Sequence, residues 1–542
     1  MNKILNKTKD FIFSKQSSIF SSAMLLSFMI IISRVFGFLR YRILASYFPT
    51  NQLDIFFASF RIPDLVFEIL ITGALTSSFI PIFIKYQKNK EELKETISSI
   101  INLIFLLMII FIIVIFISLD FIMPLITPGY SQEKIALIIF YSRILLIGQL
   151  PFMVLGNFLT GIGQSNKTFF LSAIAPIIYN LAIIIFTIFF ASSFYLLAPM
   201  FGVIIGAALM FIIQTPLLFR SDFTYGFYLK KTKGLIEFIR IIIPRAFTVI
   251  VAQIDATIDL TLTTFLGNGA YTYFYLAQHL QLLPVSVIGM AFGQASLPYL
   301  SEIYRENKIE EFKSIIVDSI LNLFFFTIPI MSFFIFARTP LVRLFFGGQQ
   351  FDWDSTVQTA ITMSYFSLSL PFHTIYYFLT RSFYALMDSR TPFYISIFSI
   401  LLNTILSLLF VFVFKFPVWA LAISFSVSMI VNVIMLLIIL SIKLHGLNFR
   451  YLFTESIKML IATGIPSVIV YYLMKVFDTL ILDTSRTINI FFLILINGII
   501  YVLLYLFLSW ILDVKEIFMI SKFILKAKEY HKKIIEIYSD YE

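Results

Sequence analysis

Residues 33–48 read SRVFGFLRYRILASYF, and residues 54–83 read DIFFASFRIPDLVFEILITGALTSSFIPIF. Both stretches are apolar enough to span a membrane, yet they contain seven charged side chains: Arg34, Arg40, Arg42, Asp54, Arg61, Asp64 and Glu68. A charge near the centre of a bilayer costs at least about 2.5–3.5 kcal/mol, so such residues usually face a bundle interior or a wet cavity. The two stretches therefore predict a membrane protein with a pathway for something polar.

The composition of the whole chain indicates a polytopic helical membrane protein. Of the 542 residues, 59% are hydrophobic and only 13% are charged, whereas a soluble protein has about a quarter charged residues. Apolar runs of roughly 20 residues recur from end to end, and they are continuous rather than alternating, which disfavours a β-barrel. The chain has no cysteine, which excludes disulfides and Cys-ligated metals.

Hydropathy predicts about fourteen spanning helices, within 20–47, 54–84, 97–124, 135–162, 169–192, 197–219, 236–266, 271–300, 314–336, 357–386, 393–414, 417–442, 453–475 and 488–511. The loops alternate in charge. One set is basic, around 85–94, 220–233, 305–313 and 443–450, whereas the other set, such as 191–199 and 266–273, carries few charges. The positive-inside rule places the basic loops in the cytoplasm, and the even number of spans then places both termini there. We expect the first helix to be retained rather than cleaved as a signal peptide.

An internal repeat predicts two lobes. Residues 74–94 (ALTSSFIPIFIKYQKNKEELK) and 291–313 (AFGQASLPYLSEIYRENKIEEFK) end spans two and eight in a similar way. These spans are six apart, so two parallel six-helix lobes are expected, with a substrate site at their interface; chance similarity between apolar sequences is the alternative. The predicted domains are 1–225 (spans 1–6), 226–445 (spans 7–12), 446–513 (spans 13–14) and 514–542. The last segment is interpreted as a basic amphipathic helix on the inner membrane surface or a solvated tail.

The charges of the first two spans suggest two roles. Asp54, Arg61 and Glu68 are seven residues apart, which places them on one stripe of a helix, and Asp64 lies close to Arg61 and Glu68 on that surface. Buried pairs between acidic and basic residues hold helices together, and we assign the acids Asp54, Asp64 and Glu68 to such structural pairing. For Arg34 and Arg61 we favour anion binding, because the guanidinium fork binds phosphate and is always charged.

Polar residues of later spans suggest ion coupling and gating. Asp255 and Asp259 are one turn apart on span seven and predict a Na⁺ or H⁺ site, to which Asn403 of span eleven adds an oxygen ligand. The alternative is a polar helix end that faces the outer water. Span ten ends RSFYALMDSRTP (381–392), whose charged residues we assign to a cytoplasmic gate: Arg381, Asp388 and Arg390.

The sequence contains no nucleotide-binding glycine loop, no metal-ligand spacing and no nucleophile–base pattern. These absences count against a primary pump and a membrane enzyme. We therefore expect a transporter without a cofactor or metal, driven by Na⁺ or H⁺ coupling or by the membrane potential. A membrane glycosyl- or acyltransferase remains an alternative class.

In the charged first two spans and in several later stretches, the sequence resembles the MurJ (MviN) family of lipid II flippases. This family lies within the superfamily that includes the MATE multidrug exporters. The resemblance rests on the opening stretch and several others: LDIFFASFRIPDL (53–65), GALTSSFIPIF (73–83), PGY (128–130), AIAPIIYNL (173–181), the pattern Pro244, Gln253 and Asp259, AFGQASLP (291–298) and RSFYALMDSRTP. It implies that Arg34 and Arg40 line a central cationic cavity and that Arg61 stands where the family tends to have a basic residue. The chain departs from the family pattern at four positions, which implies a less basic cavity: Phe67, Thr72, Gln278 and His279.

The resemblance implies a mechanism. The expected cargo is lipid II, an undecaprenyl-pyrophosphate-linked cell-wall precursor, which moves from the inner to the outer leaflet of the bacterial cytoplasmic membrane by alternating access. Arg34, Arg40 and Arg61 would hold its pyrophosphate, and the tail would lie along spans thirteen and fourteen. The expected partners are lipid II, membrane lipids and wall-synthesis proteins, but no nucleic acid, and the chain is expected to act as a monomer. The alternatives are an exporter of another polyprenyl-linked glycan, a MATE-like drug or cation antiporter, and a non-transporting scaffold of wall synthesis.

Overall fold

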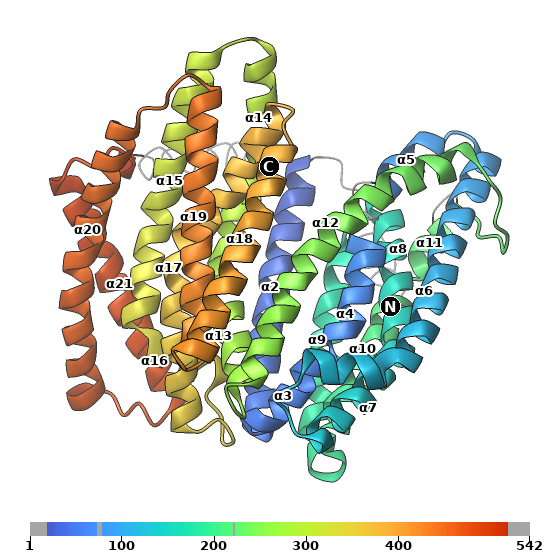
Figure 1. The fold of residues 1–542 in the computed structure, drawn as a ribbon, viewed down its shortest axis with the longest axis horizontal. Coiled ribbons are helices and arrows are strands. Elements are labelled where there is room, and N and C mark those ends of the chain that lie inside the picture. The colour runs from blue at the N-terminus through green and yellow to red at the C-terminus, as the bar shows by residue number, and fades with distance from the viewer. Residues whose placement is uncertain (1–18, 73–77, 221–222, 519–542) are drawn as a thin grey trace, which may run out of the picture. The chain divides into compact units, whose positions relative to one another are not determined.

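The computed structural model describes residues 19–72, 78–220 and 223–518, and in these ranges the regular structure is helical throughout (Figure 1). The predicted all-helical class is therefore confirmed. Within the same ranges, ten helices are long and apolar enough to cross a membrane. The described residues of each of the fourteen predicted spans are largely helical, and span two is divided among several helices. The four spans outside the ten are the first, second, seventh and tenth. They contain most of the charged residues on which the functional predictions rest, namely Arg34, Arg40, Arg61, Asp255 and Asp259.

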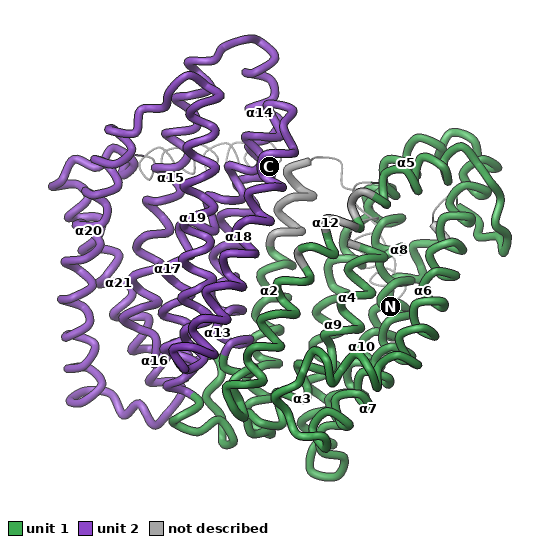
Figure 2. The backbone as a smooth tube through the Cα atoms, viewed as in Figure 1, with its two compact units in different colours: residues 1–273, 345–355 green, residues 274–344, 356–542 purple. Residues whose placement is uncertain are grey.

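The chain divides into two compact units, residues 1–273 with 345–355 and residues 274–344 with 356–542 (Figure 2). The helices of the first unit are α2 (Ile19–Tyr47), α3 (Thr50–Ser59), α4 (Arg61–Phe67), the π-helix η1 (Glu68–Thr72), α5 (Ile80–Tyr86), α6 (Lys90–Ile126), α7 (Gln132–Gly148), α8 (Leu150–Ser165), α9 (Phe170–Phe194), α10 (Leu197–Ile212), α11 (Pro216–Arg220) and α12 (Lys233–Thr264).

The helix α13 (Ala270–Pro284) begins in the first unit and continues into the second. The second unit then contains η3 (Val285–Met290), α14 (Ala291–Arg305), α15 (Ile309–Phe336), α16 (Arg338–Phe346, which ends in the first unit), α17 (Trp353–Ala385, which begins there), α18 (Arg390–Leu408), η4 (Leu409–Val413), α19 (Trp419–Lys443), α20 (Phe449–Val476), η5 (Phe477–Ile481) and α21 (Thr487–Ile511).

The boundary between the compact units differs from the predicted lobe boundary at residue 225. The helix α12, which is span seven, belongs to the first unit because it packs against α4, η1, α5 and α6. The predicted assignment of spans seven to twelve to one functional lobe thus stays a prediction. The segments 1–18 and 519–542, including most of the predicted basic tail, lie outside the described residues.

A π-helix precedes the repeated Ala-to-Pro segment in both copies of the sequence repeat. In the first copy, α4 is followed by the π-helix η1 before the repeated Ala-to-Pro segment, and in the second copy α13 is followed by the π-helix η3. Pi-helical turns are rare and occur frequently at functional sites. Each unit also contains a helical hairpin further along the chain, α9 with α10 and α18 with α19.

Two glycines allow the close packing of α10 on α9. Gly202 and Gly206 form a GxxxG pattern, which brings helix backbones together in membranes. A Cβ atom on Gly202 would lie 2.7 Å from the Cα of Ile183, and one on Gly206 would lie 2.9 Å from the carbonyl oxygen of Tyr179. The helix α2 packs on the same partner, α9, so this hairpin supports the helix that carries Arg34 and Arg40.

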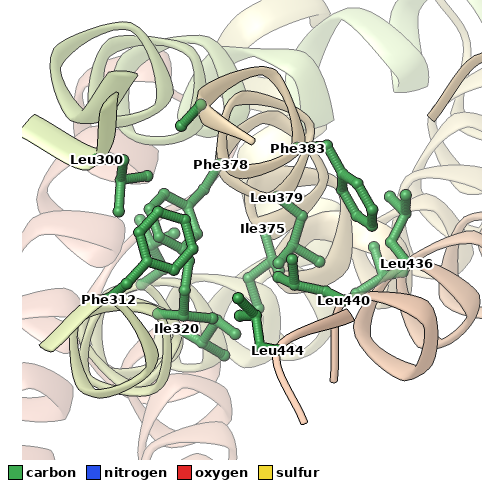
Figure 3. Close-up of a cluster of buried hydrophobic side chains, with 14 of the residues drawn as sticks. Leu300, Phe312, Ile320, Ile375, Phe378, Leu379, Phe383, Leu436, Leu440 and Leu444 are labelled. Carbon is green, nitrogen blue, oxygen red and sulfur yellow. The ribbon is translucent and has the colours of Figure 1, made fainter. Parts of the chain in front are cut away.

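The core of the second unit is a cluster of aliphatic and aromatic side chains from α14, α15, α17, α18 and α19 (Figure 3). Phe312 and Phe378 are fully buried in this cluster. A second cluster joins α15 and α20 to Tyr505 of α21 and to Val514 beyond it. These contacts fix α20 and α21, which are spans thirteen and fourteen, to span nine.

Candidate functional site

The arginines of α2 lie beside open space. Arg34, Gly37 and Arg40 are three residues apart, a spacing that makes neighbours on a helix surface. Arg34 is exposed and Arg40 is half-buried, with its guanidinium 4.6 Å from the ring centroid of Tyr41. A Cβ atom on Gly37 would meet no atom within 4 Å. This part of α2 therefore presents two cationic side chains on either side of an unfilled surface.

Arg61 begins α4 and forms hydrogen bonds to α12. Its Nη2 donates to the backbone oxygen of Gln253 at 2.6 Å and to the side-chain Oε1 of Gln253 at 2.7 Å, while its Nε donates to Oγ1 of Thr257 at 3.0 Å. Gln253 and Thr257 are four residues apart, so they share a face of α12. Sequence reasoning predicted a cationic role for Arg61 but not these two partners.

Asp54 is fully buried and has hydrogen-bond donors at both carboxylate oxygens. Lys134 Nζ donates to Oδ2 at 2.8 Å and the backbone N–H of Gly269 at 2.7 Å. The backbone N–H and the hydroxyl of Thr272 donate to Oδ1 at 2.9 and 2.7 Å. Since Gly269 and Thr272 are at the start of α13, the carboxylate also caps that helix, where the helix dipole favours a negative charge.

The ion pair with Lys134 is a finding that the sequence interpretation missed. That interpretation placed Asp54 on one stripe with Arg61 and Glu68, but α3 ends at Ser59, a new helix begins at Arg61 and a π-helix begins at Glu68. The partner, Lys134, lies 80 residues away in sequence and is itself buried, with Nζ 3.8 Å from the ring centroid of Tyr130. Lys134 therefore adds no exposed positive charge at the start of α7.

The other two acids predicted to form structural pairs have different surroundings. Asp64 is exposed and Glu68 is half-buried. Asp64 interacts electrostatically with Arg61, Glu68 and Arg40. The charges of α2, α4 and η1 thus form one electrostatic group in the first unit, while Asp54 belongs to a separate, fully hydrogen-bonded cage.

The residues predicted to couple an ion fall in both units. Asp259 is buried and Asp255 is half-buried on α12 of the first unit. Asn403 is buried on α18 of the second unit. Because Asp255 and Asp259 lie in one unit and Asn403 in the other, an ion site that all three residues share stays a prediction.

The residues predicted to form a gate lie between the last turns of α17 and the start of α18. Asp388 Oδ1 accepts hydrogen bonds from the backbone N–H groups of Arg390 and Thr391, and Oδ2 accepts from the hydroxyl of Thr391 and from Lys443. Although burial opposes the charge, these donors lower the pKa of Asp388 to about 2. Arg381 lies 5.4 Å from the ring centroid of Tyr384, and Arg390 is exposed. The observed role of Asp388 is to cap α18 and to pair with the end of α19.

An apolar groove of about 660 Å³ lies between α15 and α21 in the second unit. Its walls are phenylalanine, isoleucine, leucine and valine side chains around Pro329 and Gly498. Two tyrosines also line it, but the hydroxyl of Tyr501 donates to the backbone oxygen of Pro329 at 3.2 Å and that of Tyr505 to the backbone oxygen of Phe325 at 2.8 Å. The groove accordingly suits a hydrocarbon chain, and it is formed by spans nine and fourteen.

Comparison with known sequences identifies the family. The sequence model of the family described as "Lipid II flippase MurJ" matches residues 44–492. The chain belongs to the MurJ family. Among curated MurJ relatives, "Probable lipid II flippase MurJ" of Rickettsia prowazekii is 28% identical over 401 residues, covering 72% of this chain and 78% of the relative. "Lipid II flippase MurJ" of Thermosipho africanus is 29% identical over 398 residues, covering 72% and 80%.

Solved structures agree with this assignment. "Lipid II flippase MurJ, inward closed conformation" matches with a TM-score of 0.74 and 26% identity, covering 90% of this chain and 98% of that one. A MATE-family multidrug transporter in an inward-facing conformation matches with a TM-score of 0.64 and 15% identity, covering 78% and 98%, which shows a shared fold. The predicted MurJ resemblance is confirmed. The chain is therefore a multi-pass membrane protein of the MurJ family.

Residues at which this chain departs from the predicted MurJ pattern have local contacts. Nδ1 of His279 lies 2.8 Å from the backbone oxygen of Tyr275, and the two rings lie 4.0 Å apart between centroids. Phe67 is half-buried at the end of α4. The side chain of Thr72 lies outside the described residues.

Proposed function

We propose that this chain is a lipid II flippase that moves the lipid-linked peptidoglycan precursor from the inner to the outer leaflet of the bacterial cytoplasmic membrane. Membership of the MurJ family supports the proposal, since its curated relatives are named as such flippases. The observation that carries it at the level of residues is the pair Arg34 and Arg40 beside the open surface at Gly37. Arginine pairs well with phosphate because its planar fork forms two parallel hydrogen bonds.

We propose a division of the cargo between two chemical environments. Arg34, Arg40 and Arg61 bind the pyrophosphate, and the groove between α15 and α21 takes the polyprenyl tail. The groove supports this assignment because its walls are apolar and its two tyrosine hydroxyls are bonded to backbone oxygens. Alternating access then exposes the headgroup to one side of the membrane and to the other in turn.

Membrane orientation and energetics belong to the same proposal. We place both termini in the cytoplasm. The burial of Lys134 against Asp54 supports this orientation, because it leaves the connection between α6 and α7, which this orientation places outside, less basic. An inside-negative potential favours outward movement of an anionic headgroup by about 2.3 kcal/mol per charge per 100 mV. Coupling to Na⁺ or H⁺ through Asp255 and Asp259 is a further element of the proposal.

Substitution of Arg34 tests the function. In a strain depleted of its flippase, we expect the wild-type chain to restore growth and the amount of lipid II accessible at the outer leaflet. Arg34→Ala should restore neither, although it is present in the membrane at the wild-type level, because the phosphate loses a charged donor. Lys88→Ala, on an exposed loop, is the matched control and should behave as wild type. Normal growth and lipid II exposure with Arg34→Ala would contradict the assignment. If alanine variants of Arg34, Arg40 and Arg61 all grow normally, the alternative of a non-transporting scaffold of wall synthesis is favoured.

A further inference from the structure

The hydrogen bonds of Arg61 form a small closed network with α12. The hydroxyl of Thr257 accepts from Nε of Arg61 and donates to the backbone oxygen of Gln253 at 2.8 Å, and that oxygen also accepts from Nη2. One edge of the guanidinium, Nε and Nη2, is thus fixed at both nitrogens. None of these bonds uses Nη1, so the network orients the group without occupying all of its donors.

The acceptors of this network are neutral. Gln253 contributes an amide oxygen and a backbone oxygen, and Thr257 contributes a hydroxyl. The same helix carries two aspartates, Asp255 and Asp259. The hydrogen bonds of Arg61 to α12 go instead to Gln253 and Thr257, which share a face of that helix. A carboxylate at this place would form an ion pair with the guanidinium and cancel the charge that attracts a phosphate.

We propose that Gln253 and Thr257 are positioning residues that orient Arg61 for the pyrophosphate and, being neutral, add no negative charge that would compete with the cargo. This inference rests on the proposed function, and it adds two residues of span seven to the headgroup site. The physical gain is preorganisation: a long side chain that is already ordered loses less conformational entropy when the anion binds. The other charged or titratable groups around this network in the first unit are Arg40, Asp64, Glu68, Asp255, Asp259 and Tyr271.

Two near-isosteric substitutions of Gln253 separate this role from a purely structural one. Gln253→Glu keeps an acceptor and strengthens the link to Arg61, but it neutralises the guanidinium. Gln253→Met removes the side-chain acceptor. If Gln253 only braces α4 against α12, Gln253→Glu should melt and function as well as wild type, and only Gln253→Met should be impaired. If Gln253 positions a charged anion-binding group, Gln253→Glu should be at least as stable as wild type and yet bind the anion poorly.

The measurement uses the full chain in nanodiscs with a short-chain polyprenyl pyrophosphate as the probe. We expect both Gln253 variants to bind the probe about tenfold more weakly, or worse, because a hydrogen bond to a charged group is affected. Thr257→Val should also weaken binding, and Thr257→Ser, which keeps the hydroxyl, should restore it. Thr263→Val is the matched control on the same helix, since within the described residues the hydroxyl of Thr263 donates to the backbone oxygen of Leu260 and not to the Arg61 network.

The outcomes distinguish the inference from the proposed function. If the wild-type chain binds the probe and Gln253→Glu binds it equally well, the positioning role is wrong while the flippase proposal stands. If the wild-type chain neither binds the probe nor rescues the depleted strain, the proposed function itself fails. Weak binding by Gln253→Glu together with unchanged thermal stability supports the positioning role.

Discussion

The charged residues of the first two spans differ in their burial and in their hydrogen-bond partners. Asp54 is fully buried, with four donors on its two oxygens. Arg34 is exposed beside open space, and Arg61 is oriented by neutral acceptors. A buried charge is stable only when it is paired and hydrogen-bonded. Asp54 is therefore paired within the fold, whereas the arginines are the residues that we propose to bind the anionic cargo.

Removal of Lys134 tests the structural role of the Asp54 cage. Lys134→Met leaves the Asp54 carboxylate buried without its cation, and breaking a buried pair in this way costs about 3–5 kcal/mol. We expect a marked fall in the melting temperature of the purified protein in detergent. Lys230→Met, which breaks an exposed pair with Glu95, should change stability by less than about 1 kcal/mol. The double variant Asp54→Asn/Lys134→Met should recover part of the loss, and wild-type melting of Lys134→Met would refute the assignment.

At the scale of helices, small residues and π-helical turns shape the surroundings of the site. The hairpin of α9 and α10 packs closely because Gly202 and Gly206 have no Cβ atoms, and α2 rests on α9. The π-helices η1 and η3 interrupt the two repeated spans at corresponding places. The hairpin thus supports α2, which carries Arg34 and Arg40, although its glycines carry no charge themselves.

A single methyl group tests the packing of the hairpin. Gly206→Ala places a Cβ 2.9 Å from the backbone oxygen of Tyr179, and overpacking of this kind typically costs about 1–3 kcal/mol. We expect a lower melting temperature and reduced membrane abundance. Gly464→Ala, where a Cβ would meet nothing within 4 Å, is the matched control and should be neutral or stabilising by up to about 1 kcal/mol. Equal stability of the two variants would show that α9 and α10 separate easily.

At the scale of the whole molecule, the candidate headgroup residues and the apolar groove lie in different units. The first unit carries the arginines and the acceptors that orient Arg61, and the second carries the apolar groove. This arrangement matches an amphiphilic cargo, in which an anionic headgroup and a long hydrocarbon chain need different environments. An exporter of small cations would need neither the arginines nor the groove.

Filling the groove tests the proposed tail site. At Gly498 a Cβ would lie 3.6 Å from the ring of Phe333, so a Cβ fits but a large side chain projects into the groove. We expect Gly498→Trp to keep the binding of a short-chain polyprenyl pyrophosphate and to lose rescue of the depleted strain, because only the long tail is displaced. Phe492→Trp, at an exposed position of the same helix outside the groove lining, should rescue normally. Normal rescue by Gly498→Trp would exclude this groove as the tail site.

The sequence by itself determined the membrane class, the fourteen helical segments and the MurJ family. These properties are local, because the cost of placing a residue in lipid depends on that residue and its near neighbours. It also singled out Arg34 and Arg61, since a charge inside an apolar span is visible in the sequence alone. The likeness of residues 74–94 to 291–313 was visible in the same way.

Only the tertiary structure decided which groups meet. Asp54 is bonded to Lys134, 80 residues away, and Arg61 to Gln253, 192 residues away. The apolar groove joins α15 to α21, whereas the sequence placed the tail along spans thirteen and fourteen. Helical spacing gives the neighbours within one helix, but it carries no information about which helix packs alongside. Packing therefore decides whether each charged side chain is paired inside the fold or stays accessible to a ligand, because packing sets both its burial and its partners.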